Sequence, residues 1–352
     1  MSDAKRIILG LLLWTGVVSA VHLKLNFDWS DVVNERLPES KRRLHVAYIP
    51  VTCHLTCPVT DYISRFSSSG NIFIPKMFQG FPEIKEALIA NKMQAAFMVA
   101  PMAIALKAQG VPVRIVYLGH RYGSAIVVRK DGPVKTFPDM KGHVIAIPSR
   151  FSDERLLVYK ALAKYGMKAS DLKMVEMAPP DVAGALAAKA IDAFSMGEPY
   201  PSQAEVYGFG KVLFHARELW PDYMSCVVVV REDMIANRPD AVQTLVDGIA
   251  RSGHWLEKGR PEREHAADFV ARFYYNQDPR LLRWALTNPM DRVMYNSLSP
   301  LKPDFDMVRD LMMETGVLDK KIEFNEYIDT QFSDGAKIKT AWNYTIGSQH
   351  AE

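Results

Sequence analysis

PEIKEALIANKMQAAFMVAPMAIALKAQG, residues 82–110, recurs later in the sequence as PDVAGALAAKAIDAFSMGEPYPSQAEVYG, residues 180–208, with no gap and a constant offset of 98. Eight of the 29 paired positions carry the same residue. These include the proline that opens each stretch and the glycine that closes it. The chain therefore contains two copies of one supersecondary unit.

Each copy reads as a helix, a short strand, a helix opened by proline and a second strand. Apolar residues recur at helical spacing up to Ala90 and Ala188, and a compact apolar run follows in each copy. A proline suits the first turn of a helix, where its missing N–H costs nothing. Strand-like runs follow at residues 113–118 and 211–214. The alternation predicts an α/β protein with two parallel or mixed sheets flanked by helices.

The repeat also predicts where a ligand binds. In open α/β sheets, ligands lie beyond the carboxyl ends of the strands. The turns at residues 99–102 and 197–200 stand at those ends, so we expect both to face ligand-binding space. If the two sheets face each other, that space is one shared cleft.

Composition agrees with a folded protein of two lobes. The chain has 352 residues, of which 48% are hydrophobic and 24% charged, which suits two cores and excludes a disordered chain. The net charge of +3 is small and scattered, so we expect no nucleic-acid partner.

The N-terminus has the pattern of an export signal. Lys5 and Arg6 precede an uninterrupted apolar run, residues 7–18, and Val18, Ser19 and Ala20 suit a signal peptidase. We expect residues 1–20 to be a signal peptide and residues 21–43 a loose linker with at most one helical turn. An uncleaved anchor and a buried helix remain as alternatives.

Two more segments approach the expected cleft. Residues 44–50 (LHVAYIP) form a strand pattern, and the polar, turn-rich loop at 51–61 follows, which would bring Thr52 and His54 to a carboxyl end. Residues 144–152 (VIAIPSRFS) run from a buried strand through Ser149 and Arg150 into a helix at 153–165. A helix start attracts anions, although ordinary capping by Ser152 or Asp153 explains the same pattern.

Four phrases carry a resemblance to a known family: DMKGHVIAIP (139–148), IDAFSMGEPY (191–200), ELWPDY (218–223) and REDMIANRPDAVQ (231–243). They resemble the periplasmic substrate-binding proteins of nitrate, sulfonate, taurine and bicarbonate ABC importers, a family shared with pyrimidine-precursor binding proteins. The resemblance covers roughly residues 44–255. The sequence departs from the family at VTCHLTCPVTDYISRFSSSG (51–70), so the first binding loop is unusual.

The resemblance implies a two-lobed periplasmic-binding-protein fold with a hinge and a central cleft. It places residues 44–127 and 224–330 in lobe 1, residues 128–223 in lobe 2 and residues 331–352 in a C-terminal tail. Crossovers near 128–131 and 217–223 would be the hinges. Helices expected at 239–258, 261–275, 279–288 and 304–315 would pack behind lobe 1.

Glu198 is the first candidate ligand contact, because Ala100 stands at the equivalent place in the first copy. A buried carboxylate is rare unless paired, so Glu198 either accepts a hydrogen bond from the ligand or forms a salt bridge with a neighbour such as Arg150 or Lys211. Three further reasons add candidates: His54 and His120 follow strands, Tyr200 stands next to Glu198, and Tyr223 lies at the expected second hinge. The full set of candidate ligand-binding residues is Thr52, His54, Met98, His120, Ser149, Arg150, Glu198, Tyr200 and Tyr223.

The cysteines leave three interpretations open. Cys53 and Cys57 could form a disulfide in an oxidising compartment, remain free as small hydrophobic residues, or bind a metal with His54. A structural zinc needs four ligands and no second pair exists, so no metal is expected. Cys226 starts an apolar run and is expected to be a buried thiol.

No motif for catalysis or for a cofactor is found: the sequence has no nucleophile elbow, zinc-protease helix, phosphate loop or dinucleotide fingerprint. The resemblance therefore implies a binding protein and no enzyme: a monomer that takes a small polar or anionic solute by lobe closure outside the cytoplasm and delivers it to an ABC permease. An enzyme of the pyrimidine-precursor or menaquinone-pathway type and a membrane-tethered sensor domain are the alternatives.

Overall fold

The computed structural model describes residues 3–26, 29–67 and 70–336, together with Trp342, Tyr344 and Ile346. The expected C-terminal tail beyond residue 336 lies outside the described residues apart from those three. The chain divides into two compact units, residues 1–43 and residues 44–352.

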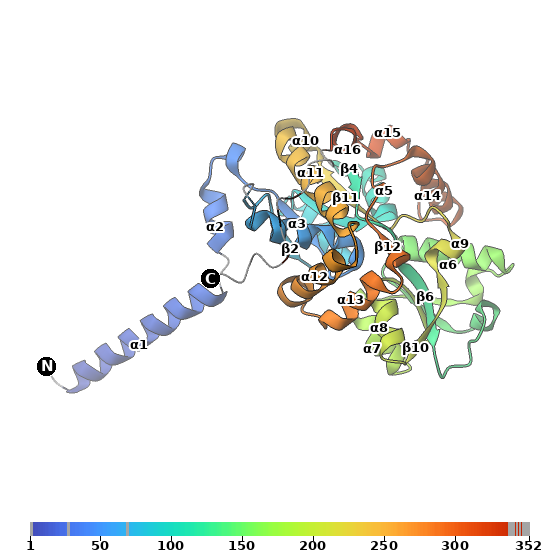
Figure 1. Cartoon of the computed structure of the whole chain (residues 1–352), viewed down its shortest axis with the longest axis horizontal. Helices are drawn as coiled ribbons and strands as arrows, with labels where there is room; N and C mark the ends of the chain where they lie inside the picture. The colour runs from blue at the N-terminus through green and yellow to red at the C-terminus, as the bar shows by residue number, and fades with distance from the viewer. Residues whose placement is uncertain are drawn as a thin grey trace. The chain divides into compact units, whose positions relative to one another are not determined.

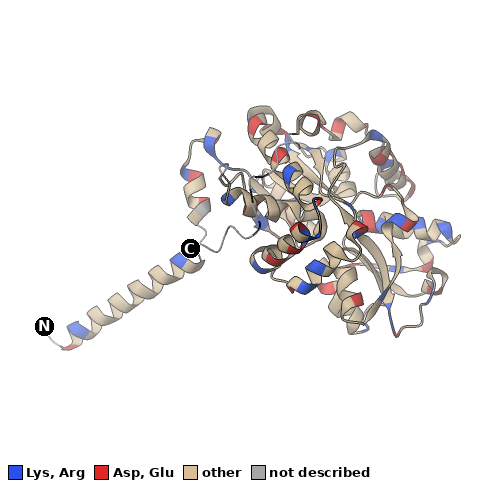
Figure 2. Ribbon diagram, viewed as in Figure 1, with Lys and Arg blue, Asp and Glu red and all other residues tan. Residues whose placement is uncertain are grey.

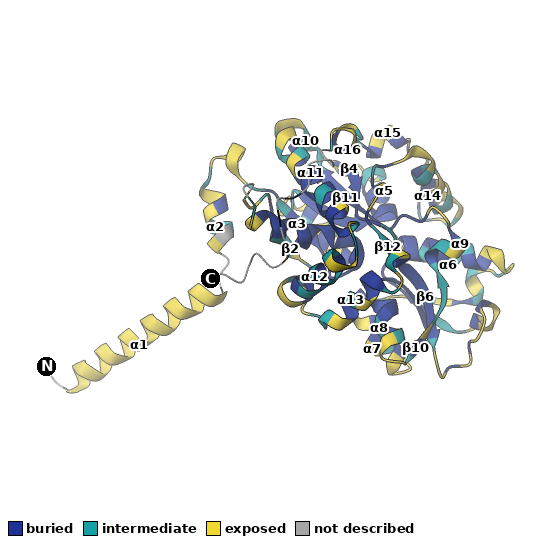
Figure 3. Ribbon diagram, in the orientation of Figure 1, coloured by how far each residue is buried: buried dark blue, intermediate teal, exposed yellow. Residues whose placement is uncertain are grey.

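The first unit is helical. Helix α1 (Asp3–Asn26) is exposed along its whole length (Figure 3) and carries charge only near its ends (Figure 2). By length and composition it could cross a membrane, a test that a signal sequence near the N-terminus also passes. Helix α2 (Trp29–Arg36) and a 3₁₀ turn (Glu39–Lys41) follow.

The expectation of at most one helical turn in residues 21–43 is therefore wrong. The eight residues of α2 make two turns. The Asn34 carboxamide holds the end of this segment, since it donates to the carbonyl of Arg43 and accepts from the Arg43 N–H. Such local side-chain bonds are not visible in composition.

The second unit contains two mixed five-stranded sheets (Figure 1). The first has the order β2-β1-β3-β11-β4. Strands β2 and β3 run parallel to β1, whereas β11 runs antiparallel to both β3 and β4. Its strands are β1 (His45–Tyr48), β2 (Ile74–Met77), β3 (Ala95–Val99), β4 (Val113–Leu118) and β11 (Cys226–Arg231).

The second sheet repeats this plan in the order β10-β6-β9-β7-β8. Strands β8 and β9 run parallel to β7, and β6 runs antiparallel to β9 and β10. Its strands are β6 (Ser124–Arg129), β7 (Val144–Ile147), β8 (Lys173–Glu176), β9 (Ala193–Gly197) and β10 (Gly210–His215). Each sheet thus receives one antiparallel strand by a crossover of the chain, and the α/β fold with two mixed sheets is confirmed.

We call the first sheet with its helices lobe 1 and the second sheet with its helices lobe 2. The helices of lobe 1 are α3 (Thr56–Arg65), α4 (Phe81–Ile89) and α5 (Ala100–Ala108). Those of lobe 2 are α6 (Asp153–Lys164), α7 (Val182–Ala187), α8 (Tyr200–Val206) and α9 (Ala216–Leu219). Figure 3 shows the central strands buried beneath these helices, β3 and β11 in the first sheet and β6 and β9 in the second. The edge strands β8 and β10 are partly exposed.

The repeat is confirmed in detail. Helix α4, β3, α5 and β4 occur in the same order as α7, β9, α8 and β10. Strands β3 and β9 begin and end at an offset of 98 residues. Gly110 and Gly208 both have φ in the left-handed region, +86° and +76°, which glycine adopts without strain. The glycine that closes each stretch is therefore required by the turn after the second helix.

Two boundaries differ from the sequence prediction. Residues 124–127 belong to β6 in the second sheet, so the first crossover lies at residues 119–123 and not at 128–131. Residues 56–61, expected as loop, form the start of α3. Pro58 did not prevent this helix because proline is tolerated in the first turn. The expected lobe boundary at residue 128 is still a prediction. The strand pairings favour a boundary nearer residue 119.

The remaining helices form a tail after β11: α10 (Glu232–Asn237), α11 (Pro239–Leu256), α12 (Arg260–Val270), a π-helical turn (Ala271–Tyr275), α13 (Pro279–Thr287), α14 (Lys302–Glu314), α15 (Phe324–Tyr327) and α16 (Gln331–Asp334). The tail does not pack behind lobe 1 alone. Helix α11 packs on α3, but α13 packs on α8 and α14 on both α5 and α6. Strand β12 (Val293–Met294) pairs with β5 (Arg121–Tyr122) inside the first crossover. These helices after β11, which we call the helical tail, therefore pack against both lobes.

Candidate functional site

The two lobes touch through the turns that the repeat singled out. The backbone N–H of Thr52 in lobe 1 donates to the carbonyl of Glu198 in lobe 2 over 2.8 Å. The backbone N–H of Ala100 in lobe 1 donates to Asp153 Oδ2 in lobe 2 over 3.2 Å. Because Ala100 and Glu198 stand at the same position of the repeat, each copy presents one backbone group to the opposite lobe.

Thr52 and His120 form the lobe 1 side of this boundary. Thr52 Oγ1 lies 3.1 Å from His120 Nε2, and the Tyr295 hydroxyl donates to the Thr52 carbonyl. Burial lowers the pKa of His120 to about 3, so the ring is neutral at physiological pH. Among the described residues, His120 Nδ1 has no hydrogen-bond partner.

Glu154 and Asp153 form the lobe 2 side at the start of α6. The Tyr223 hydroxyl donates to Ser124 Oγ, which in turn donates to Glu154 Oε1 over 3.1 Å. Burial raises the pKa of Glu154 to about 7. Burial, and next the neighbouring Glu154, raise the pKa of Asp153 well above its ordinary value. Ser152 caps the helix by accepting from the Arg155 N–H, as the capping interpretation expected.

Glu198 has its own counter-ion in the tail. Its Oε1 accepts from Arg292 over 2.8 Å, and its Oε2 accepts from the backbone N–H of Ser202 over 3.0 Å. Arg292 also pairs with Glu205. Both oxygens of Glu198 are thus used inside the protein, which favours the salt-bridge alternative, although the partner is Arg292 and neither Arg150 nor Lys211. The side chain of Glu198 is 1% exposed.

Tyr200 lines a cavity of about 430 Å³ where both lobes meet the tail. Its hydroxyl donates to the carbonyl of Pro50 over 3.3 Å. Tyr275 donates to the neighbouring carbonyl of Val51, and the Gln277 amide reaches Pro50 as well. The cavity is lined by Pro50, Met77, Gln79, Pro180, Tyr200, Gln203, Tyr207, Tyr275, Asn276, Gln277, Asp278 and Leu281.

Four of the candidate residues lie apart from this boundary. Met98 is buried within β3. Ser149 Oγ accepts from the Phe151 N–H, a local turn bond. Arg150 is exposed and lies over the Phe151 ring, 4.8 Å from its centroid. His54 packs against Phe97 in lobe 1. The structure brings together Thr52, His120, Glu198, Tyr200 and Tyr223.

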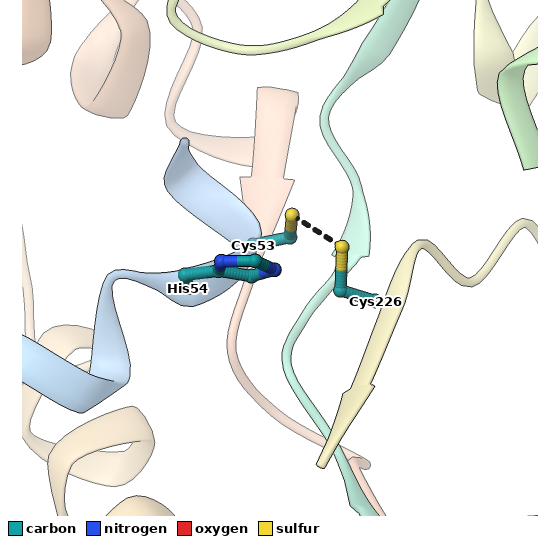
Figure 4. Close-up of side chains that lie close together, drawn as sticks. All are labelled: Cys53, His54 and Cys226. Carbon is teal, nitrogen blue, oxygen red and sulfur yellow. Dashed lines mark hydrogen bonds between the residues drawn. The ribbon is translucent and has the colours of Figure 1, made fainter. Parts of the chain in front are cut away.

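A disulfide between Cys53 and Cys57 was one of three interpretations of the sequence, and in this structure both are free thiols. All three cysteines are free and buried. Cys53 Sγ lies 2.7 Å from Cys226 Sγ (Figure 4), so Cys53 faces β11 and not Cys57. Cys53 and Cys57 form no disulfide in this structure, and Cys57 lies within α3. Cys226 is a buried thiol, as expected.

Cys53, His54 and Cys226 place one possible metal-ligating atom each within 4.8 Å of one another. The hydrogen bonding of His54 opposes a metal there. Its Nδ1 accepts from the backbone N–H of Ile49 over 2.8 Å, so the neutral ring carries its proton on Nε2. A protonated nitrogen has no lone pair for a metal, and the other nitrogen is already occupied. Burial also raises the pKa of the Cys226 thiol well above its ordinary value.

Sequence reasoning missed four residues of the site: Ser124, Asp153, Glu154 and Arg292. Asp153 was interpreted only as a helix cap. Two adjacent acidic residues after Ser152 were a usable signal, because they fill a helix start that would otherwise attract an anion. Arg292 gave no signal, since it stands 94 positions from Glu198.

Comparison with known proteins identifies the family. The model of the NMT1-like family matches residues 37–271, well over half of the chain, so the chain belongs to the NMT1-like family. It is 28% identical over 200 residues to a protein of Brucella abortus (strain 2308) named only as a binding protein. That match covers 56% of this chain and 60% of the Brucella protein, so the chain spans less than two thirds of its relative's length.

A second relative and a solved structure agree with this family assignment. The chain is 31% identical over 116 residues to an aliphatic sulfonates-binding protein of Escherichia coli (strain K12), a match that covers 32% of this chain and 36% of that protein. The fold is similar to that of a zinc-bound ligand-binding component of an ABC-type import system from Staphylococcus aureus, with a TM-score of 0.76 and 20% identity. That match covers 84% of this chain and 99% of the other, and it shows the fold.

Proposed function

We propose that this protein captures a small solute between its two lobes outside the cytoplasm and delivers it to the permease of an ABC importer. The repeat turns carry the proposal, because each presents a backbone group to the opposite lobe at the place where open α/β sheets bind ligands. The binding proteins among its relatives support it. The functional unit is a monomer, since both faces of the site come from one chain.

The mechanism is a shift in population between open and closed lobes. A solute that touches both lobes does so only when they are closed, and this difference in affinity favours closure. In this structure direct hydrogen bonds join Thr52 to Glu198 and Ala100 to Asp153 across the two lobes. Solute binding exchanges some of these bonds for its own.

The alternative of an enzyme on the same frame receives little support from the thiols. Nucleophilic cysteines need a lowered thiol pKa. Here burial raises the pKa of Cys57 and of Cys226 well above the ordinary value. We therefore propose binding without catalysis. The tethered-sensor alternative requires α1 to remain attached.

Closure is tested by solution scattering of the purified protein with and without saturating solute, chosen by a thermal-shift panel of nitrate, sulfonate, bicarbonate, amine and heterocyclic compounds. A compound that binds only the folded protein raises its stability by about 2.7 kcal/mol at a hundredfold excess over its Kd. We expect the radius of gyration to fall at constant mass. A stabilising compound that leaves the scattering profile unchanged contradicts lobe closure.

Export is tested at the N-terminus. We propose that α1 contains a signal peptide that is cleaved after Ala20, so the exported protein should begin at Val21. N-terminal sequencing of the protein from the extracytoplasmic fraction measures this. A protein that retains residues 1–20 in the membrane supports the anchored alternative, and one that stays in the cytoplasm contradicts export.

A further inference from the structure

Asp153 and Glu154 are buried carboxyl groups with unused hydrogen-bonding capacity. They are 0% and 3% exposed. Asp153 Oδ2 and Glu154 Oε1 accept from Ala100 and Ser124, but Asp153 Oδ1 and Glu154 Oε2 have no partner among the described residues. No basic side chain in the described part of the chain perturbs either group. The pair is therefore a buried acidic site without a counter-ion.

Glu198 is a buried acidic residue of the same lobe that is fully paired, and it provides the comparison. Its two oxygens are filled by Arg292 and by the Ser202 N–H. An uncompensated buried charge is costly, which is why buried acids are normally paired. Asp153, which bonds across the lobe boundary, and Glu154 have no such partner. Without a cation they are held in the protonated form, and a cation from outside the protein would stabilise their ionised form.

The position of the pair makes it reachable when the lobes separate. The bond from Ala100 to Asp153 Oδ2 crosses between lobes and breaks on opening. The bond between Ser124 and Glu154 stays within lobe 2, since β6 and α6 belong to one lobe. Opening thus exposes Asp153 to solvent while Glu154 remains held in place.

We propose that Asp153 and Glu154 bind a cationic solute that donates N–H bonds, such as one with an ammonium, guanidinium or amidinium group. This inference rests on the proposed function and names its solute class. The free oxygens of both carboxyl groups accept from the cation, and Ala100 keeps one lobe 1 contact near it. An anion at this helix start meets two carboxyl groups in place of free N–H groups, so sulfonates and nitrate are disfavoured.

Binding of a cation requires the pair to ionise, so affinity depends on pH. The pKa of Glu154 is raised to about 7, and the cation therefore displaces protons at lower pH. The other titratable groups that face the pair are Tyr223 and Cys226, both with a pKa raised well above the ordinary value. Strands β6 and β9 contribute only the hydroxyls of Ser124 and Ser195.

The charges on the neighbouring helices are paired or exposed. On α9, Arg217 pairs with Asp291, and on α14 three acidic residues pair with basic side chains: Asp304 with Arg121, Asp306 with Lys302 and Arg309, and Asp310 with Arg309. The remaining acidic residues of these helices, Glu218 and Glu314, are exposed to solvent. Arg155 on α6 itself bonds to Tyr159 and the Thr315 carbonyl. The pH dependence thus reports on Asp153 and Glu154.

The experiment measures binding of methylguanidinium, ethylammonium and acetamidinium, with ethanesulfonate and nitrate as anionic probes, by calorimetry and thermal shift on the whole protein. We expect at least one cation to bind, with affinity about tenfold lower at pH 6 than above pH 7. Glu154→Gln should weaken that binding about ten- to a hundredfold. Asp153→Asn should weaken the same binding as well. Glu86→Gln, on the exposed face of α4, is the matched control and should bind like the wild type.

Two results overturn the inference. One is the absence of binding by all three cations; the other is cation binding that Glu154→Gln and Asp153→Asn leave unchanged. If ethanesulfonate or nitrate binds and reduces the radius of gyration, the solute class is wrong but the proposed function stands. If a cation binds at the acidic pair and the radius of gyration does not change, the solute class stands and lobe closure fails.

Discussion

Arg292→Met is expected to lower the free energy of unfolding by about 3–5 kcal/mol, because it leaves buried Glu198 without its cation. Arg292 and Glu198 are 7% and 1% exposed, and their charged groups lie 2.8 Å apart. Glu205 loses a partner too, but it is 30% exposed and solvent can hydrate it. Urea unfolding of wild type and variant measures the difference.

The matched control for Arg292→Met is Arg217→Met. Arg217 pairs with Asp291 close to Arg292, but these side chains are 33% and 57% exposed. Exposed pairs contribute up to about 1 kcal/mol, so this variant should differ little from the wild type. The double variant Glu198→Gln, Arg292→Met removes both charges and should recover part of the loss. Equal effects of Arg292→Met and Arg217→Met contradict a buried ion pair.

The second large effect is a pH dependence of stability that Glu154 causes. Its pKa is raised in the folded state from the ordinary 4.5 to about 7. The folded protein therefore binds this proton more tightly than the unfolded chain does. The contribution of protonated Glu154 to the free energy of unfolding is fully present below about pH 4.5 and is lost as the pH rises through about 7. The shift corresponds to about 3 kcal/mol.

Glu154→Gln isolates this effect because glutamine resembles the protonated side chain. The variant should match the wild type near pH 4.5 and exceed its stability by about 3 kcal/mol at pH 8, without solute. Thermal or urea unfolding across this range gives the difference. Glu86→Gln is again the control, since its side chain is exposed. A difference between wild type and Glu154→Gln that stays constant with pH contradicts a raised pKa.

Much of the fold could be predicted from the sequence because the same supersecondary unit occurs twice. Strands, proline-started helices and closing glycines at a fixed offset define the unit, and prolines marked the tail helices within a few residues. The second turn of α2 was missed, because the bonds from the Asn34 carboxamide to the Arg43 backbone leave no trace in composition. The start of α3 was missed because the polar composition of residues 51–61 resembles a loop, although the helix is buried.

The site was less predictable. Glu198 stood out against Ala100, yet its role depends on Arg292, which is remote in sequence and gives no periodic signal. Asp153 and Glu154 were visible as a helix start, but their burial follows from how the lobes meet. Thr52 and His120 were predicted because residues at strand ends converge on one edge of a sheet, and Tyr223 because it lies in the expected second crossover. The topology predicted where residues of the candidate site lie. Which side chain neutralises each buried acid could be seen only in the tertiary structure.

The tail has a consequence for how solute affinity is set. Arg292 fastens the tail to lobe 2, and β12 pairs with β5 in the crossover between the lobes. In the proposed mechanism, opening strains one or both of these attachments, so the tail would help to determine the fraction of molecules that is open before any solute arrives. Apparent affinity scales with the fraction of molecules in the binding-competent state. Substitutions in the tail can therefore retune the solute concentration at which the protein loads, while every residue that touches the solute stays the same.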